Sequence, residues 1–168
     1  MRRAGLICGW ILFVHIASFD SNAAAEPLAA GDRLTSFSLQ DQHGVAHTVD
    51  GSTRLILFSR DMDGGKLLKE ALSEAPEGFL EDRATVYLAD ISGMPKLVAR
   101  LFALPSMRKR PYPVLLDRDG STTEQLPDLE GHATLIFCQE LEITRVEHVE
   151  TPDAVRQALA ALTSSSKD

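Results

Sequence analysis

The pattern of apolar and polar positions along the chain predicts a mixed α/β domain. Short runs rich in Leu, Ile, Val and Phe are bounded by Gly, Pro or Asp, as strands commonly are. The two earliest runs flank the turn signal of residues 41–44, which predicts a hairpin. The predicted strands are residues 37–39, 46–49, 54–59, 85–89, 114–116, 133–138 and 143–147.

Helical spacing appears between several of these strands. Residues 65–73 predict a helix, a second helix opens at residues 92–95, and Pro105 begins a Pro-rich, basic connection. The last helix has Thr151 as its predicted N-cap and a proline in its first turn. The apolar positions with helical spacing are Leu97, Val98, Leu101, Phe102 and Leu104 in the second helix, and Val155, Leu159 and Leu162 in the last.

This order of elements predicts one mixed sheet. Strands joined through helices become parallel, and strands joined by a tight turn become antiparallel. A length of 168 residues suits a single domain with a substantial core. The expected fold class is therefore α/β, with helices on both faces of the sheet and an N-terminal β-hairpin.

The charge balance argues against a nucleic-acid-binding protein. The formal net charge is -7, and charges of both signs are interspersed, whereas such proteins need a basic surface. The only basic tract is residues 108–110, in the Pro-rich connection. This tract could contact an acidic partner or lipid headgroups, although three charges on such a loop are more typical of plain surface.

Residues 1–25 have the pattern of a secretory signal peptide. A short basic start precedes an apolar stretch, and residues 23–25 supply the small side chains of a cleavage site before Glu26. The apolar stretch is shorter than the roughly 20 residues that span a bilayer, which favours cleavage over an uncleaved anchor. We therefore expect a periplasmic or secreted protein with no stable membrane insertion after cleavage.

The expected mature protein has a folded domain over residues 26–163 and a polar tail over residues 164–168. Cleavage removes Cys8 and leaves Cys138 as the single thiol. A lone cysteine cannot form an internal disulfide in an oxidising compartment.

The strand at residues 55–59 runs into a charged, Gly-rich corner at residues 60–66 and then into a helix. Ligands gather at such corners, because free backbone N–H groups and the positive end of the helix dipole meet there. In one interpretation the corner is a pocket for a small polar group or a docking surface, with glycines that allow close approach to the backbone. In the other it is a capped helix start, with Asp63 as N-cap and Lys66 in solvent. Asp90 ends the next parallel strand near the same edge of the sheet. In the first interpretation it belongs to the binding site, and in the second it caps the following helix.

The order of elements and the export signal resemble the thioredoxin-like fold in its peroxiredoxin and periplasmic thiol-reductase version. The sequence is also similar to uncharacterised exported bacterial proteins with a Ser-Arg-Asp-Met-Asp-Gly-Gly-Lys corner. The likeness spans nearly the whole mature chain. The residues that carry it are Gly31–Asp32, residues 37–41, Gly44, and residues 55–72, 113–120 and 133–137.

Reductases of this type carry Cys-x-x-Cys at the corner, where the helix N-terminus lowers the pKa of the first thiol. The resemblance places this pair on Met62 and Gly65, and the family's cis-proline on His132 or Ala133. None of these residues matches the family pattern. The resemblance therefore implies a degenerate member, without thiol–disulfide exchange or thiol peroxidase activity.

Asp61–Met62–Asp63–Gly64 also resembles the opening motif of haloacid-dehalogenase-type phosphatases. In that family the first Asp is the nucleophile, the second is an acid/base, and Mg²⁺ neutralises the charge. Residues 115–121 match the motif better, but they lie too close to the C-terminus for the rest of that fold. Gly65 stands where the family has Thr. Because Asp-Gly favours turns, two copies are more simply explained as turns.

His132 precedes a core strand and, in the fold that the resemblance implies, lies across from Met62 and Gly65. A His there could act as an acid/base or a metal ligand, although a hydrogen-bonded structural His is more common. The other histidines show no ligand spacing, so a zinc or copper site is not expected. No Gly-x-Gly-x-x-Gly supports a flavin or nicotinamide, so no cofactor is expected.

These observations favour a binding or accessory module whose partner is an envelope protein or a small polar ligand. One rival is an oxidoreductase that relies on Cys138, although that residue is more typical of a small buried hydrophobe. The less favoured rival is a Mg-dependent phosphatase that uses Asp61 and Asp63. The residues expected to form the binding site are Arg60, Asp61, Met62, Asp63, Gly64, Gly65, Lys66, Asp90 and His132.

Overall fold

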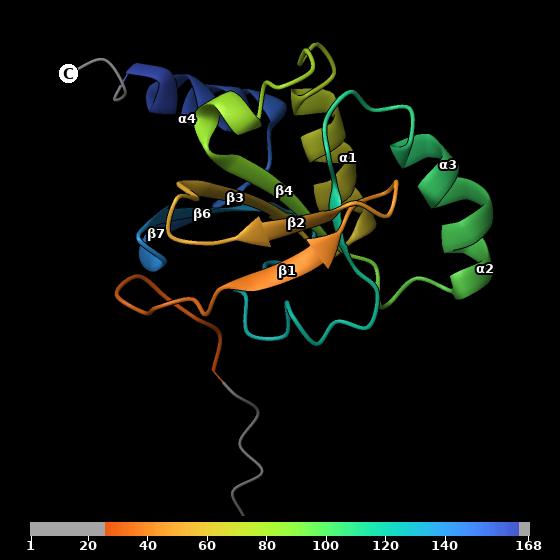
Figure 1. The fold of residues 1–168 in the computed structure, drawn as a ribbon, viewed down its shortest axis with the longest axis horizontal. Coiled ribbons are helices and arrows are strands. Elements are labelled where there is room, and N and C mark those ends of the chain that lie inside the picture. The colour runs from red at the N-terminus through yellow and green to blue at the C-terminus, as the bar shows by residue number, and fades with distance from the viewer. Residues whose placement is uncertain (1–25, 165–168) are drawn as a thin grey trace, which may run out of the picture.

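The computed structural model describes residues 26–164, so the predicted leader with Cys8 and most of the predicted tail lie outside the described residues. The described chain forms a five-stranded sheet with the order β5-β4-β3-β6-β7, and a two-stranded hairpin (Figure 1). The seven predicted strands are confirmed. Their bounds are β1 (Phe37–Gln40), β2 (Ala46–Val49), β3 (Leu55–Ser59), β4 (Thr85–Asp90), β5 (Leu115–Asp117), β6 (Ala133–Gln139) and β7 (Glu142–Val149).

The sheet is mixed because two kinds of connection build it. β3, β4 and β5 run parallel, since a crossover joins each to the next. β6 runs antiparallel to β3 and to β7. Glu140 and Leu141 both have positive φ angles, 49° and 69°, and form the tight turn that allows β7 to fold back on β6.

Each face of the sheet has its own core, because successive side chains of β3 point to opposite sides. Leu55 and Leu57 pack on the face that carries α1 (Met62–Ala71) and α4 (Pro152–Ser164). Ile56 and Phe58 pack on the other face, beneath apolar side chains of the hairpin and of the segment after β5. The hairpin thus covers the second face, where a helix was expected.

The last helix docks as its pattern predicts. Thr151 Oγ1 accepts a hydrogen bond from the Ala154 backbone N–H at 3.4 Å, which confirms Thr151 as the N-cap. Val155 is fully buried and Leu159 is nearly so, and both pack against the core on the α1 face.

The second predicted helix packs differently from its pattern. Leu97 and Phe102 of its apolar stripe are 68% and 70% exposed, and it is mainly Leu104 and Met107 that reach the core. The segment lies at the edge of the sheet, so most of its stripe faces away from the core (Figure 1). Pro105, which was predicted to begin a loop, lies instead in the first turn of α3. A helix tolerates the missing N–H of proline in its first turn. The segment consists of α2 (Lys96–Val98), a π-helical turn η2 (Ala99–Ala103) and α3 (Leu104–Met107), and the short 3₁₀-helix η1 (Glu81–Arg83) precedes β4.

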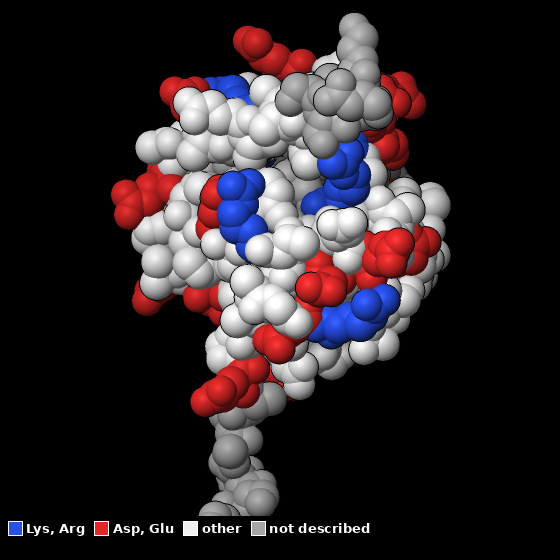
Figure 2. Space-filling model, turned by 90° about the vertical axis from the view of Figure 1, so that its left-hand side faces the viewer, with Lys and Arg blue, Asp and Glu red and all other residues white. Residues whose placement is uncertain are grey.

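The surface shown in Figure 2 carries basic and acidic side chains close to one another, as the interspersed charges of the sequence predict. Within residues 26–164, no helix has the length and apolar character that a membrane span requires.

Candidate functional site

Helix α1 begins at Met62, three residues before the predicted start, because Asp61 is its N-cap. Asp61 Oδ1 accepts a hydrogen bond from the Gly64 N–H at 2.7 Å, and its Oδ2 accepts one from the Gly131 N–H at 2.6 Å. The prediction of Asp63 as the cap was wrong, since Asp63 is exposed and instead pairs with Lys66 at 2.8 Å. Both Asp61 oxygens are therefore occupied in joining α1 to the loop before β6.

Gly64 packs directly against the backbone of His132. A Cβ at Gly64 would overlap the His132 carbonyl oxygen, so this glycine is required for close approach of the chain to itself. The sequence interpretation had assigned the close approach to a ligand. At Gly65 the nearest atom to a Cβ is Ser59 Oγ at 3.8 Å, which is an ordinary contact.

The position of His132 across from the corner is confirmed, but its side chain bonds elsewhere. Its ring nitrogens lie 2.8 Å from the Glu130 carbonyl oxygen and 2.8 Å from Glu150 Oε1. These hydrogen bonds, to Glu130 first and then to Glu150, raise the pKa of His132. The imidazole thus has the hydrogen-bonded structural position that was the commoner of the two expectations.

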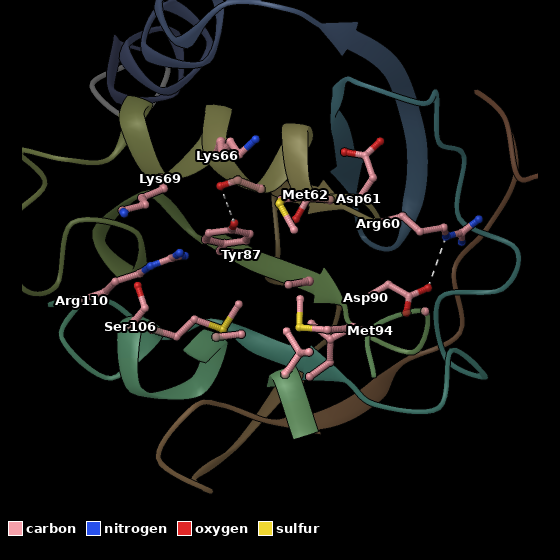
Figure 3. Close-up of a pocket in the computed structure, with 18 of the residues that line it drawn as sticks. Arg60, Asp61, Met62, Lys66, Lys69, Tyr87, Asp90, Met94, Ser106 and Arg110 are labelled. Carbon is pink, nitrogen blue, oxygen red and sulfur yellow. Dashed lines mark hydrogen bonds and ion pairs between the residues drawn. The ribbon is translucent and has the colours of Figure 1, made fainter. Parts of the chain in front are cut away.

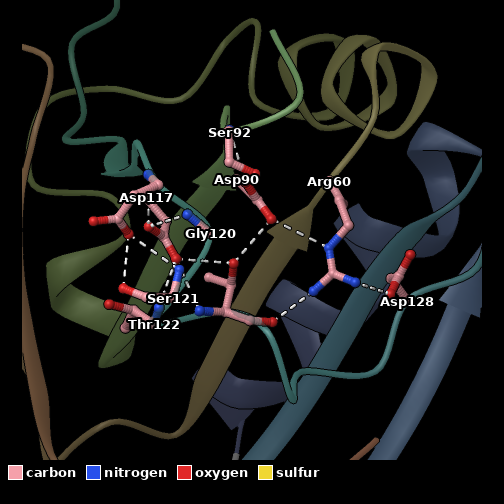
Figure 4. Close-up of polar contacts among 10 residues, drawn as sticks. Arg60, Asp90, Ser92, Asp117, Gly120, Ser121, Thr122 and Asp128 are labelled. Carbon is pink, nitrogen blue, oxygen red and sulfur yellow. Dashed lines mark hydrogen bonds and ion pairs between the residues drawn. The ribbon is translucent and has the colours of Figure 1, made fainter. Parts of the chain in front are cut away.

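Arg60 is held by contacts within the chain (Figure 4). Its Nη1 donates to Asp128 and its Nη2 to the Thr123 carbonyl oxygen. Its Nε forms an ion pair with Asp90 Oδ2 at 3.2 Å, although the N–H is not aligned for a hydrogen bond. Arg60 therefore supports the wall of the site more than it offers a free cation.

Asp90 and Asp117 lie side by side at the ends of β4 and β5, and both are buried. The Thr123 hydroxyl lies 3.0 Å from a carboxylate oxygen of each, and it can donate to only one of them at a time. Asp117 also accepts backbone N–H groups from Gly120, at 2.9 Å, and from Thr123, at 2.8 Å. These contacts give the second Asp-x-Asp-Gly motif the turn-forming role that the sequence favoured.

Asp90 also accepts a hydrogen bond from the Ser92 N–H at 2.9 Å, which closes a turn rather than capping α2, whose N-cap is Pro95. Across residues 26–164, no group of three or more His, Cys, Asp or Glu side chains is placed to hold a metal ion.

A cavity of about 510 Å³ opens beside the corner, between α1 and the α2–α3 segment (Figure 3). We call it the corner cavity. Asp63, Gly64 and His132 of the predicted site do not line it. The predicted residues that do line it are Arg60, Asp61, Met62, Gly65, Lys66 and Asp90.

The walls of the corner cavity are mainly apolar, and they include residues that sequence reasoning missed. Met94, Val98 and Met107 come from the segment after β4, and Tyr87 lies on β4 itself. Arg110 lines the cavity from the loop after α3. Residues 92–95 were predicted as the start of a helix, but no local pattern indicated that this segment would stand off from α1.

No protein-family model matches the sequence, and a search of curated proteins finds no match. Solved structures do match. Peroxidoxin BcpB from Mycobacterium tuberculosis superposes with a TM-score of 0.51 at 21% identity, over 82% of this chain and 97% of that one. A thio-disulfide isomerase from Thermus thermophilus gives a TM-score of 0.51 at 20% identity, over 80% and 97% of the two chains.

The chain has the thioredoxin-like fold. A peroxiredoxin-like protein from Aquifex aeolicus adds a third match, with a TM-score of 0.51 at 16% identity over 83% of this chain and 90% of that one. The fold that the resemblance implied is confirmed, and so is the expected α/β class with its N-terminal hairpin, apart from the helix expected on the second face of the sheet. At these identities the likeness defines the fold alone, so any function must be argued from the site residues.

Cys138 lies far from the corner of this thioredoxin-like fold. Its N–H donates to the Arg54 carbonyl oxygen at 2.9 Å, at the start of β3, whereas the corner follows the end of β3. At about 3.3 Å per residue, Arg54 and Arg60, which flank the two ends of the strand, are roughly 20 Å apart. The side chain is buried, and burial raises the pKa of the thiol to about 11. Cys138 thus packs as a small hydrophobe, as predicted.

Proposed function

We propose that the protein is an exported binding module that holds a small ligand with an apolar body in the corner cavity, without thiol chemistry. The observation that carries this proposal is the position of the cavity. It lies where the carboxyl ends of β3 and β4 meet α1, the usual place for ligands in sheets of this kind, and Met62 and Gly65 are among its lining residues.

The lining of the cavity supports an apolar occupant. Apolar walls with a few polar groups are typical of small-molecule sites, and about 510 Å³ lies within their ordinary range. The polar groups at the corner end already have partners, because Asp61 binds two backbone N–H groups and Arg60 binds Asp90 and Asp128. A small polar ligand, as first expected, would find few free partners at that end. A compact cavity also suits a small ligand better than an extended surface of an envelope protein.

The proposal can be tested with a neutral apolar fluorescent probe, N-phenyl-1-naphthylamine. Val98 lines the cavity, so Val98→Trp fills it and should abolish probe binding. Val45 is a matched control, because it is 55% exposed on the hairpin turn and does not line the cavity. Val45→Trp should bind the probe as the unsubstituted protein does. Equal binding by both variants, or no binding by the unsubstituted protein, would contradict the proposal.

Thiol chemistry and phosphoryl transfer are tested on the same preparation. We expect no disulfide reduction, no peroxide turnover and no Mg²⁺-dependent phosphatase activity. The buried position of Cys138 and the occupied oxygens of Asp61 support this expectation. An activity abolished by Cys138→Ser or by Asp61→Asn would replace the binding proposal with the corresponding enzyme.

Export is tested separately by expressing the full chain in a Gram-negative host. The mature protein recovered from the periplasm should begin at Glu26, as determined by intact mass. A cytoplasmic or membrane-bound full-length product would contradict the export proposal without bearing on the cavity.

A further inference from the structure

Arg110 presents an unsatisfied cation to the corner cavity. Its Nε and Nη1 atoms are buried, and within residues 26–164 neither has a hydrogen-bond partner. The side chain extends along the cavity wall near Lys69 and Ser106 (Figure 3). Buried polar groups in native proteins are nearly always hydrogen-bonded, and a charged group without acceptors is the most costly exception.

The contacts that Arg110 does make supply no hydrogen-bond acceptor to its Nε and Nη1 atoms. Its guanidinium carbon lies 5.7 Å from the centre of the Tyr87 ring, within the range of a cation–π attraction. That attraction is electrostatic, and it offers no lone pair to the buried N–H groups. Glu77 and Glu81 share a second hollow with Arg110, but no ion pair joins either of them to it in the described part of the chain. The third nitrogen, Nη2, is not among these buried atoms, so it is the one that an acceptor oxygen from outside the chain can reach directly.

The polar groups of the cavity are divided between its two ends. Asp61 and Asp90 lie at the corner end with Arg60, whereas Arg110 and Lys69 lie at the other (Figure 3). Lys69 is two turns beyond Asp61 along α1, about 12 Å at 1.5 Å per residue. The apolar side chains Met94 and Val98 also line the cavity. An occupant that fits both features has an anionic head and an apolar body.

We propose that the corner cavity binds an amphipathic carboxylate, such as a medium-chain fatty acid. The carboxylate lies on Arg110, assisted by Lys69, and the apolar chain lies against the methionines and Val98. Nη2 donates the first hydrogen bond to the carboxylate, and a turn of the side chain that frees a second nitrogen would complete the bidentate pair that a planar guanidinium can form and a point charge cannot. This inference rests on the proposed function, because it names the ligand class of the same cavity.

Calorimetric titration with octanoate and with octanol tests the head group, since the two probes share one chain and differ in charge. Octanoate should bind more tightly than octanol. Arg110→Gln should lower the octanoate affinity by about tenfold or more and leave the octanol affinity unchanged, because a hydrogen bond to a charged group is lost. Arg110→Lys should recover only part of the loss. Lys109→Gln is the matched control, because Lys109 is exposed next to Arg110 and does not line the cavity. It should change the octanoate affinity less than twofold.

Each alternative outcome is distinct. Binding of neither probe would mean that the proposed function itself fails. Equal binding of octanoate and octanol, or an Arg110→Gln variant with unchanged octanoate affinity, would overturn the carboxylate inference and leave the apolar cavity standing. Tighter binding of octyl phosphate than of octanoate would overturn the choice of head group.

A measurement without substitutions keeps the inference falsifiable if Arg110→Gln fails to fold. In ¹⁵N-labelled unsubstituted protein, octanoate should shift the Arg110 Nε–Hε resonance, and octanol should not. An Arg110 Nε–Hε resonance whose chemical shift does not change at saturating octanoate would overturn the inference.

Discussion

The carbonyl oxygen of His132 lies against the α-carbon of Gly64, so the first turn of α1 and the start of β6 meet without room for a side chain. Asp61 reinforces the same junction through its hydrogen bonds to Gly64 and to Gly131. The corner is therefore held rigidly by the chain itself. The part of the corner that remains open to a ligand is the corner cavity, which Met62 helps to line.

Gly64→Ala should destabilise the protein by about 1–3 kcal/mol or more, because the new methyl group overlaps backbone that cannot move away. Gly65→Ala is its matched control in the same helical turn. It meets only Ser59 Oγ at 3.8 Å, and alanine favours a helix over glycine, so stability should be unchanged or rise by up to about 1 kcal/mol. Chemical denaturation of the two variants measures the difference. Equal stabilities would refute the close approach.

Asp61→Ala should lower the free energy of unfolding by about 1–2 kcal/mol, because the helix loses its N-cap. Asp63→Ala removes an exposed carboxylate that pairs with Lys66, and it should cost about 0.5 kcal/mol or less. The comparison of the two variants by urea unfolding tests which aspartate caps α1. A larger loss of unfolding free energy for Asp63→Ala than for Asp61→Ala would support Asp63 as the N-cap, as the sequence suggested.

Cys138 should react slowly with thiol reagents in the folded protein. With a pKa of about 11, only about one thiol in ten thousand is ionised at pH 7, and the side chain is buried. In a Cys8→Ser chain, iodoacetamide labelling at pH 7 should proceed at least about a hundredfold more slowly than in denaturant, where the pKa returns to about 8.5. Rapid labelling of the folded protein would indicate a reactive thiol and support the oxidoreductase rival.

The hydrogen bonds of His132 should make part of the stability depend on pH. Its pKa in the folded state is raised by Glu130 and Glu150, so its contribution is fully present below the unfolded-state value of 6.5. The contribution is lost as pH rises through the folded-state pKa. His132→Gln should therefore lower Tm more at pH 6 than at pH 9.

Glu150→Gln provides the control, because it removes one cause of the raised pKa of His132. In a Glu150→Gln background, the loss of Tm caused by His132→Gln should differ less between pH 6 and pH 9. A His132→Gln variant whose loss of Tm is the same at both pH values would show that the imidazole does not gain a proton on folding.

Much of the fold could be predicted because it follows from neighbouring residues. Alternation along β3 and the turn at residues 41–44 are local signals, and so are the apolar positions Val155 and Leu159 on α4. The corner was located for the same reason, since a strand that runs into a helix is visible in one short stretch. The choice of cap failed because Asp61 and Asp63 both suit a helix start. The partner that decided between them, Gly131, lies far along the chain.

The sequence by itself determined the order of strands and helices, the absence of a cysteine pair at the corner and the place where a site would form. Only the tertiary structure decided that His132 closes on Gly64, that Leu97 and Phe102 remain exposed, and that Arg110 reaches the corner cavity. The physical reason is that local periodicity selects a backbone conformation, whereas these contacts depend on how elements far apart in the chain pack together. A polar or apolar residue acquires its function from what it meets in that packing.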